Sequence, residues 1–253
     1  MKLTEVFQRL ILKHIDALPV SKKGRPVSIN NQESLDHIFH VCRTGMSWRD
    51  IRAPVSYVTI FRRMQHWSKS GVFSNAYKDV LALYRKLNPN RFYCVDSTYV
   101  KNRHGIAPYV GRNHTDRGRK ALKCSVITDQ AGVVHGVSMD PGNVPDVSLL
   151  QRTISGNLVQ LDRLPLYADR GYDSRHNRGV LHASGFADRI FRRRTKTTRR
   201  TNARRIAVEH TFAWLDHYKR LNRFYERTPS LYSSFLLLAL GQLVSKRYLV
   251  GGG

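Results

Sequence analysis

The chain has 253 residues, of which 41% are hydrophobic; this excludes an intrinsically disordered protein and allows one large domain or two small ones. Its 43 Lys and Arg against 18 Asp and Glu leave a formal net charge of +25, so we expect a polyanionic partner. Nucleic acid is the first choice, although ribosomal and membrane-surface proteins share this charge balance.

The ends of the chain and its cysteines bear on location. Residues 1–16 carry apolar positions at helical spacing, unlike the unbroken apolar block of a signal peptide. The longest apolar run, 235–244, is about half a membrane span, so we expect no transmembrane helix. Cys42, Cys94 and Cys124 are too far apart for a CxxC motif, and their odd number argues against a disulfide framework. A reducing cytoplasm fits best.

Residues 1–88 are expected to form a helical domain. A basic linker at 21–26 follows the first helix, and Ser47 is expected to cap a short helical turn. This punctuation is typical of a helix-turn-helix. The expected helical segments are 1–16, 33–43, 48–51 and 56–70.

The segment 56–70 has the pattern of a recognition helix. Ile60, Met64 and Trp67 share one face, while basic side chains cover the others, as on a helix that lies against DNA. A helical bundle with a solvated basic face is the alternative. The candidate DNA contacts on this helix are Arg62, Arg63, His66 and Lys69.

Asn88-Pro89-Asn90 marks a boundary, because the apolar runs after it are continuous, as in buried strands. The residues from 89 to 253 are therefore expected to form a second domain. Strands followed by an alternation of strands and helices indicate an α/β sheet, with one long irregular loop over 104–120. The expected strands are 92–95, 122–128, 133–139, 164–168 and 187–191, and the expected helices are 145–154, 174–184 and about 202–218.

Asp96 and Asp169 each close a short apolar run and precede a change of chain direction, so both are expected at the carboxyl edge of the sheet. If their strands are neighbours, the two carboxylates lie close together, which is unfavourable unless one is protonated or a divalent cation lies between them. Mg²⁺ suits such oxygen ligands. Glu209, on the next helix, would complete a site for two ions roughly 4 Å apart that activates a water or a 3′-hydroxyl.

Each acid also has a simpler interpretation. An aspartate at a strand end is most often a turn or cap residue. Glu209, the only acid between Asp188 and Asp216, could pair with Arg205 one helical turn earlier. Asp140 and Asp146 are rival metal ligands for which loop and helix-cap roles are preferred, Asp129 is expected in a hairpin turn, and Asp173 is a candidate helix cap.

Several blocks of the chain together resemble a bacterial insertion-sequence transposase of the DDE type, in the insertion-sequence-five family. The resemblance covers nearly the whole chain. In the second domain the blocks are Val95-Asp96-Ser97-Thr98, the hairpin 123–132, Tyr167-Ala168-Asp169-Arg170-Gly171-Tyr172-Asp173 and Arg205-x-x-x-Glu209-x-x-Phe212-x-x-Leu215. In the first domain they are 24–26, 43–50 and 61–67.

The resemblance implies a ribonuclease-H-like catalytic domain, in which Asp96, Asp169 and Glu209 bind two Mg²⁺ ions, with Mn²⁺ as a substitute. It implies Arg205 as a phosphate contact. The chain departs from the family pattern at His210, where arginine is frequent, and at Asp216, where a basic residue is expected. Lys219 and Arg220 are the candidates to bind that phosphate in its place.

The activity implied is cleavage at the terminal inverted repeats of an element, followed by transfer of the 3′ end to target DNA. The partners implied are double-stranded DNA and a second copy of the chain, as a dimer or higher oligomer, in the bacterial cytoplasm and on the nucleoid when DNA is bound. Two alternatives remain: a domesticated or decayed transposase that acts as a non-catalytic DNA-binding regulator, and a nuclease that has the same triad and cuts without joining.

Overall fold

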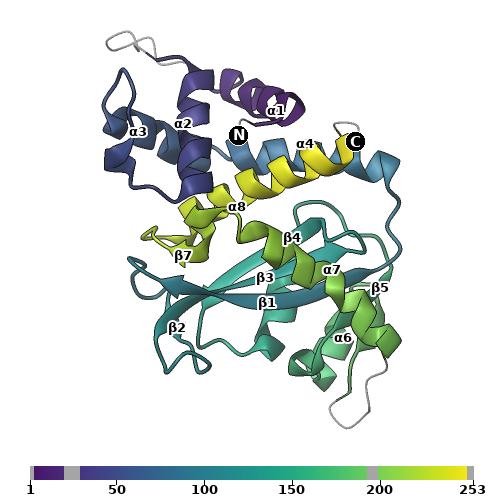
Figure 1. The fold of residues 1–253 in the computed structure, drawn as a ribbon. Helices are drawn as coiled ribbons and strands as arrows, with labels where there is room; N and C mark the ends of the chain where they lie inside the picture. Colours follow the sequence, from purple (N-terminus) through teal and green to yellow (C-terminus); the bar gives the residue numbers. More distant parts are fainter. Residues whose placement is uncertain (1–2, 20–28, 193–198, 250–253) are drawn as a thin grey trace. The chain divides into compact units, whose positions relative to one another are not determined.

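The computed structural model describes residues 3–19, 29–192 and 199–249, with the side chains of 199–205 outside the description. The chain divides into two compact units. One unit, here the helical unit, comprises Met1–Lys86, His217–Asn222 and Pro229–Gly253; the other, the α/β unit, comprises Leu87–Asp216 and Arg223–Thr228. Figure 1 gives the labels and the chain colours. The expected basic linker at 21–26 lies outside the described residues.

Helix α2 of the helical unit begins and ends at recognisable caps. Asn30 starts α2 with a capping box, in which its side chain accepts from the Glu33 amide and the Glu33 side chain accepts from the Asn30 amide. Gly45 ends α2 at φ 70°, a conformation that favours glycine. The segments are α1 (Glu5–Asp16), α2 (Asn31–Thr44), η1 (Trp48–Asp50), α3 (Tyr57–Lys69), α4 (Val72–Leu87), η4 (Lys219–Asn222), α8 (Pro229–Val244) and η5 (Ser245–Leu249).

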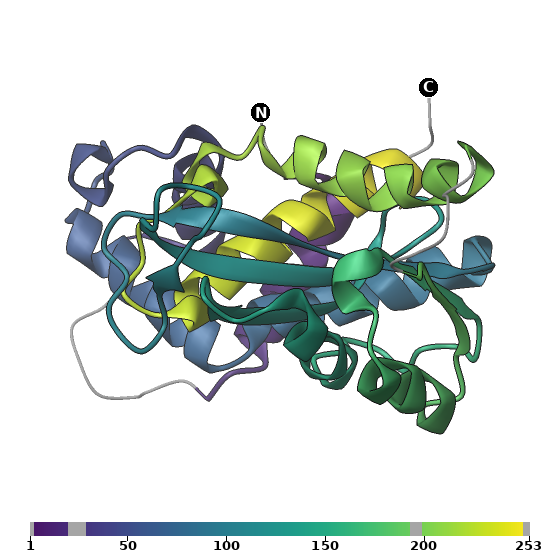
Figure 2. The ribbon, with the colours of Figure 1, turned by 90° about the horizontal axis from the view of Figure 1, so that it is seen from below.

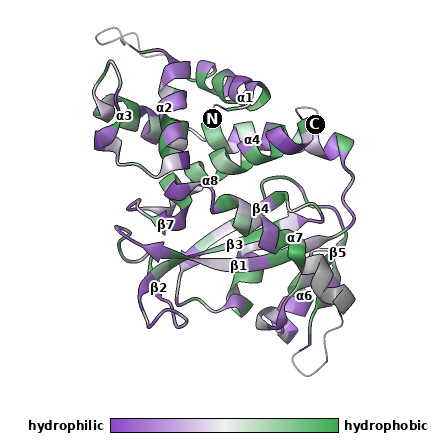
Figure 3. Ribbon diagram, in the orientation of Figure 1, coloured by the Kyte–Doolittle hydropathy of each residue, from purple (hydrophilic) through white to green (hydrophobic). Residues whose placement is uncertain are grey.

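Helix α8 is the core of the helical unit. Of its 16 residues, 11 are buried, and they lie on all sides of the helix, as expected for a helix that neighbours surround. Figure 3 colours most of it as hydrophobic. Its Gln242 accepts from the Thr4 amide at 2.8 Å, and its Ser234 shares a hydrogen bond with Ser68 at 2.7 Å. No helix in the described ranges has the length and apolar character needed to cross a bilayer.

The two units differ from the expected domains 1–88 and 89–253, each of which would be one continuous stretch of the chain. The carboxyl-terminal helix packs with the amino-terminal helices because the apolar run from Phe235 to Val244 fills the space between them. The sequence pattern also did not reveal α4, which follows Gly71 directly. Here φ is 72°, so the chain turns between two helices without a long loop.

The described part of the α/β unit contains a seven-stranded mixed sheet. Its central order is β4-β3-β1-β5-β6: β1, β3 and β4 are antiparallel, whereas β5 and β6 run parallel to β1. The two short strands extend one end of the sheet, β2 on β3 and β7 on β1. The strands are β1 (Tyr93–Asn102), β2 (Gly111–Arg112), β3 (Lys120–Asp129), β4 (Val134–Pro141), β5 (Pro165–Ala168), β6 (Ala187–Ile190) and β7 (Arg223–Phe224).

Helices cover both faces of this sheet. Tyr93, Val95 and Ile127 form a buried core with side chains of α5 and α6. Helix α7 lies on the opposite face; Figure 2 shows it in light green on one side of the strands, with the darker green α6 on the other. The helical segments are η2 (Asp146–Ser148), α5 (Leu149–Ser155), η3 (Arg170–Tyr172), α6 (Arg175–Ala183) and α7 (Arg199–Leu215).

Two expectations for this unit were wrong. Strand β1 continues to Asn102 instead of ending at Val95, because β3 pairs with it over its whole length from Tyr93 to Lys101. The segment 104–120 is not one irregular loop, since β2 pairs with β3 within it. The predicted hairpin, the later strands and the later helices are confirmed to within a few residues.

Candidate functional site

The pairing of β1 with β5 brings two acids together. Tyr93 lies opposite Leu166 and Cys94 opposite Tyr167, in parallel register. The same register, continued two residues, sets Asp96 opposite Asp169. Asp96 was expected at the end of its own strand. It lies instead inside β1, beside the point where the neighbouring strand β5 ends.

Asp96 belongs to the sheet face that α7 covers. Tyr93 and Val95 of β1, and Leu166 and Ala168 of β5, contribute to the core beneath α5 and α6. Side chains alternate along a strand, so Asp96, which follows Val95 within β1, points to the other face, whereas Asp169 follows the last residue of β5 and starts η3. Both carboxylates are half-buried.

Main-chain amides hold one oxygen of each carboxylate. Asp96 Oδ1 accepts from the Ser97 amide at 2.8 Å, and Asp169 Oδ1 accepts from the Gly171 amide at 2.8 Å at the start of η3. Close by, the fully buried hydroxyl of Tyr172 has a raised pKa, chiefly because burial disfavours the phenolate and further because of the negative charges of Asp96 and Asp146. The phenol thus stays neutral beside these acids.

Helix α7 is seated on the turn between β3 and β4. The Thr211 hydroxyl donates to the Gly132 carbonyl at 2.7 Å, and a Cβ at Gly132 would lie 2.8 Å from the Ala207 carbonyl oxygen. Val208 and Leu215 are buried, whereas Glu209 is exposed. Glu209, the third predicted acid, therefore lies beside the buried face of α7 and is itself exposed to solvent.

The residues present fit a hard divalent cation in donor type. Among the described residues, no group of three His, Cys, Asp or Glu is already arranged around a metal position. Mg²⁺, however, is usually held by one or two carboxylates together with water and substrate phosphate. Asp96 and Asp169, in register on adjacent strands, match that requirement, and Glu209 is available from α7.

Asp146 has a position that was not predicted from the sequence. It was expected to have a helix-cap role at 145–154, but its Oδ1 accepts from the Ser97 hydroxyl and from Lys123 Nζ, each at 2.7 Å. A Cβ at Gly171 would lie 3.0 Å from Asp169 Oδ1 and 3.3 Å from Asp146 Oδ2, so both carboxylates border this glycine. No sequence spacing connects these partners.

Lys123 is the cation of this network. It is 3% exposed, donates to the Val144 carbonyl at 3.1 Å and lies 4.9 Å from the centre of the Tyr99 ring. A buried lysine is retained only when it is paired. Lys123 and Asp146 therefore fix the loop before α5 against β1 and β3, beside Asp96.

The other acids weighed as alternatives are engaged elsewhere. Asp129 makes the hairpin turn, where its Oδ1 accepts from the amides of Ala131 and Val133. Asp140 pairs with Arg152. Asp173 pairs with Arg178, and the cap of α6 is Ser174 instead.

Two of the predicted DNA contacts form hydrogen bonds inside the helical unit. Arg63 donates to the carbonyls of Ile29 and Asn30 and to the Ser34 hydroxyl, at 2.7–2.8 Å, and burial lowers its pKa. Arg220 is 7% exposed and donates to the Met46 carbonyl at 3.3 Å. Both guanidinium groups make their hydrogen bonds inside the helical unit, and their contact with DNA stays a prediction.

The remaining predicted contacts are at the surface or outside the description. Arg62, His66 and Lys69 are exposed on α3, and Lys219 is exposed on η4. Arg205 lies in α7, but its side chain is among those not described. His210, at the position where the family pattern favours arginine, faces Trp214 with ring centres 6.0 Å apart.

Known proteins place the chain in a family. Residues 88–241 match the family described as "Transposase DDE domain", and residues 5–76 match "Putative transposase of IS4/5 family". A "Putative transposase for insertion sequence element IS402" from Burkholderia cepacia is 34% identical over 163 residues, which are 61% of this chain and 74% of that protein. The "Insertion element IS402 uncharacterized 16.2 kDa protein" of the same organism is 32% identical over 78 residues, 29% of this chain and 53% of its own length.

The fold agrees with this assignment. The piggyBac transposase, solved in a synaptic complex with hairpin DNA, aligns with a TM-score of 0.51 at 10% identity, covering 95% of this chain and 72% of that one. The expected fold class, a ribonuclease-H-like α/β sheet preceded by a helical region, is thereby confirmed. The chain belongs to the DDE transposases, in the group that serves bacterial insertion sequences.

Proposed function

We propose that this transposase binds the terminal inverted repeats of its element as double-stranded DNA, cuts a strand there and joins the freed end to target DNA. The observation that carries the proposal is the β1–β5 register, which sets Asp96 opposite Asp169 at the end of β5. Two carboxylates brought together in this way repel each other unless a cation or a proton compensates them.

Asp96, Asp169 and Glu209 are the residues proposed to hold Mg²⁺, with Mn²⁺ as a substitute. Bound there, two such ions would supply Lewis acidity at the attacking and leaving oxygens of the phosphoryl group. Hydrogen bonds from the Ser97 and Gly171 amides fix the orientation of the two aspartates, and the Lys123–Asp146 ion pair lies beside them. Because Glu209 is exposed on α7, it can approach the DNA strand as well as the aspartates.

The reaction needs no covalent protein intermediate. A water oxygen attacks the phosphorus at the element end, and the bond from phosphorus to the 3′ oxygen breaks, which frees a 3′-hydroxyl. That hydroxyl then attacks a phosphorus of target DNA at the same acids, and the bond broken in the target strand releases a second 3′-hydroxyl. In both steps the acids position the oxygens in line, which is the main contribution that a protein makes to phosphoryl transfer.

The helical unit is proposed to read the inverted repeat. Three side chains on α3, Arg62, His66 and Lys69, are exposed on a helix whose apolar face is buried, the arrangement that a recognition helix requires. Lys219 and Arg205 are proposed phosphate contacts. A dimer that pairs two element ends is part of the proposal, since joining requires both ends.

The proposal is tested with the full chain, Mg²⁺ and a duplex that carries the element's own ends, with cut and joined strands resolved on denaturing gels. Asp96→Asn, Asp169→Asn and Glu209→Gln are expected to lose both products while they retain DNA binding. Asp140→Asn is the matched control, because it removes another acid of the same unit, one that pairs with Arg152. Full activity in any of the three variants would show that the triad is wrong.

The same assay separates the alternatives. A wild-type chain that binds the ends but leaves them uncut with Mg²⁺ or Mn²⁺ would be a DNA-binding regulator. A chain that cuts and never joins would be a nuclease. Either result overturns the proposed transposition chemistry.

A further inference from the structure

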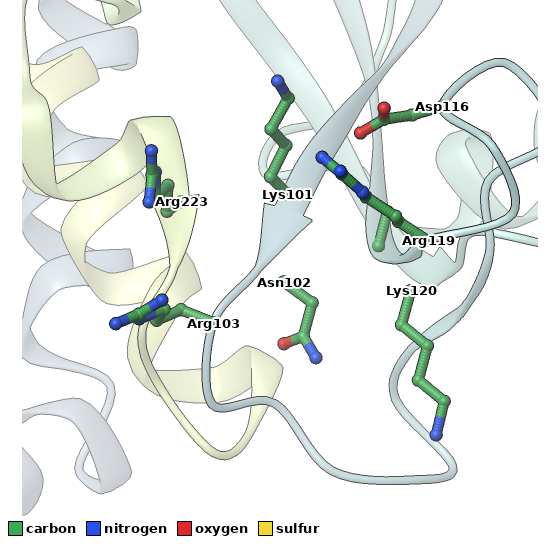
Figure 4. Close-up of a pocket in the computed structure, with 8 residues that line it drawn as sticks. Lys101, Asn102, Arg103, Asp116, Arg119, Lys120 and Arg223 are labelled. Atoms are coloured by element: carbon green, nitrogen blue, oxygen red, sulfur yellow. The ribbon is translucent and has the colours of Figure 1, made fainter.

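A second basic feature lies at the end of β1 that is remote from Asp96. It is a pocket of about 190 Å³ within the α/β unit, and Figure 4 shows its side chains. The residues come from the end of β1, the start of β3, the turn before β3 and β7, and one acid, Asp116, is among them. The cations, here called the strand-end cations, are Lys101, Arg103, Arg119, Lys120 and Arg223.

The sheet register forces like charges together at this place. Lys101 of β1 lies directly opposite Arg223 of β7, and Lys120 of β3 lies directly opposite Arg112 of β2. Like charges at directly opposed positions destabilise a sheet. All five strand-end cations are exposed, and none of them forms an ion pair within the described ranges. Among the described residues that line the pocket, five cations therefore face one acid, Asp116, and none of the five is held in an ion pair.

The chemistry of the pocket selects a phosphate. Guanidinium and ammonium groups supply only donors, and guanidinium matches the oxygens of phosphate in pairs. The side chain of Asn102 is already bonded to Gly105 in both directions, at 2.7 and 3.2 Å. No aromatic ring of the described residues lines the pocket, so it offers nothing on which a base could stack. The features fit the sugar-phosphate backbone better than a free nucleotide.

The strand β1 separates the pocket from the acids. From Asp96 to Asn102 the strand advances six residues, which at about 3.3 Å each is about 20 Å. Lys101 is five residues after Asp96, so its side chain leaves the opposite face of β1. We propose that the strand-end cations bind the phosphate backbone of the DNA at a place separate from the phosphate that is cut. This inference rests on the proposed function of the acids for its position, but not for the binding itself.

The binding is tested with the full chain and a fluorescein-labelled 30-base-pair duplex of arbitrary sequence, by anisotropy in EDTA at several salt concentrations. The variant, here the pocket variant, is Lys101→Ala with Arg223→Ala. Removal of each phosphate interaction should lower the slope of log K against log salt by about 0.9, or about 1.8 for both, and should weaken binding roughly eightfold per interaction at 0.1 M salt. The variant removes a like-charge pair, so its thermal stability should be unchanged or higher.

A matched variant controls for net charge. Arg91→Ala with Arg163→Ala removes two exposed cations of the same unit that do not line the pocket. Wild-type affinity and salt slope in the pocket variant, or equal losses in both variants, would overturn the inference. The expected result is a loss confined to the pocket variant.

The position is tested on a duplex that the wild type cuts. Uncharged methylphosphonates are placed one at a time along this duplex, away from the cut. At the position bound by the pocket, the substitution should weaken binding of the wild type and have no effect on the pocket variant. Equal effects on both proteins at every position would overturn the inference. If no duplex is cut, the proposed function fails, whereas the anisotropy result still decides whether the pocket binds DNA.

Discussion

In the ion pair of Lys123 and Asp146 only the lysine is buried, so we expect the loss of either partner to have a different cost. Lys123→Met loses the 2.7 Å bond to Asp146, which for a charged partner contributes about 1.5–3 kcal/mol, and the 3.1 Å bond to the Val144 carbonyl. The methionine side chain fills most of the space without a charge to desolvate. Because the Asp146 side chain is 36% exposed, its remaining carboxylate is still solvated. We expect a net loss of about 2 kcal/mol.

Asp146→Asn is expected to cost more, although it changes fewer atoms. It leaves the Lys123 ammonium with 3% exposure and no anion, and removal of one partner of a buried pair typically costs about 3–5 kcal/mol. The assay is urea unfolding followed by circular dichroism, with hydrogen exchange of the β3 amides to assign the transition to the α/β unit. Asp146→Asn should have the lower midpoint. The reverse order, or two variants as stable as the wild type, would refute the claim that burial of the lysine decides the energetics.

Three further predictions concern the helical unit and α7. Arg63→Ala should lower the free energy of unfolding by about 2 kcal/mol, because it removes three hydrogen bonds at the start of α2. Arg62→Ala should weaken DNA binding and leave stability unchanged. Thermal melting and DNA-binding anisotropy of both variants test this, and an exchange of the two effects would contradict it. Gly132→Ala should displace α7, because φ is 80° at this glycine and a carbonyl oxygen of α7 would lie 2.8 Å from the new Cβ. Strand cutting should therefore fall while DNA binding persists. Unchanged cutting would contradict the proposed role of this contact in positioning Glu209. Burial alone would raise the pKa of Asp79, but hydrogen bonds and charges from a lysine and a histidine of α1 leave it below the ordinary 3.8; its stabilising effect is therefore present at neutral pH and lost as pH falls through the lowered pKa. The stability difference between the wild type and Asp79→Asn should accordingly vanish in acid, and a constant difference down to pH 2 would contradict the assignment.

The position of Asp169 was predictable because strand ends are visible in a sequence. A short apolar run followed by an acid and a turn marks the place where a parallel strand stops, and that place is also where functional side chains gather. The pattern could not show that β1 continues beyond Asp96, since that depends on pairing with β3, which is a long-range contact. The extension leaves Asp96 at the end of β5 instead of at the end of its own strand.

The use of each cation was not predictable from local sequence. Arg62 and Arg63 are neighbours with the same chemistry, yet only Arg63 reaches the carbonyls that precede α2. Arg220 is buried and donates a hydrogen bond to the carbonyl of Met46, which is far away in the chain. Asp146 accepts from Ser97 and pairs with Lys123, which are also distant in sequence. In each case tertiary packing determines the partner, and the periodicity of a helix or strand does not predict it.

The origin of the helical unit from both ends of the chain has a consequence for its synthesis. On the ribosome, α1 to α4 emerge first, but their shared apolar side stays uncovered until α8 follows, after the entire α/β unit has been made. The sheet has all its central strands by Ile190 and can fold while synthesis continues. The helices proposed to read DNA would therefore become ordered last, so that a truncated chain should have a folded catalytic sheet without a competent reader of element ends.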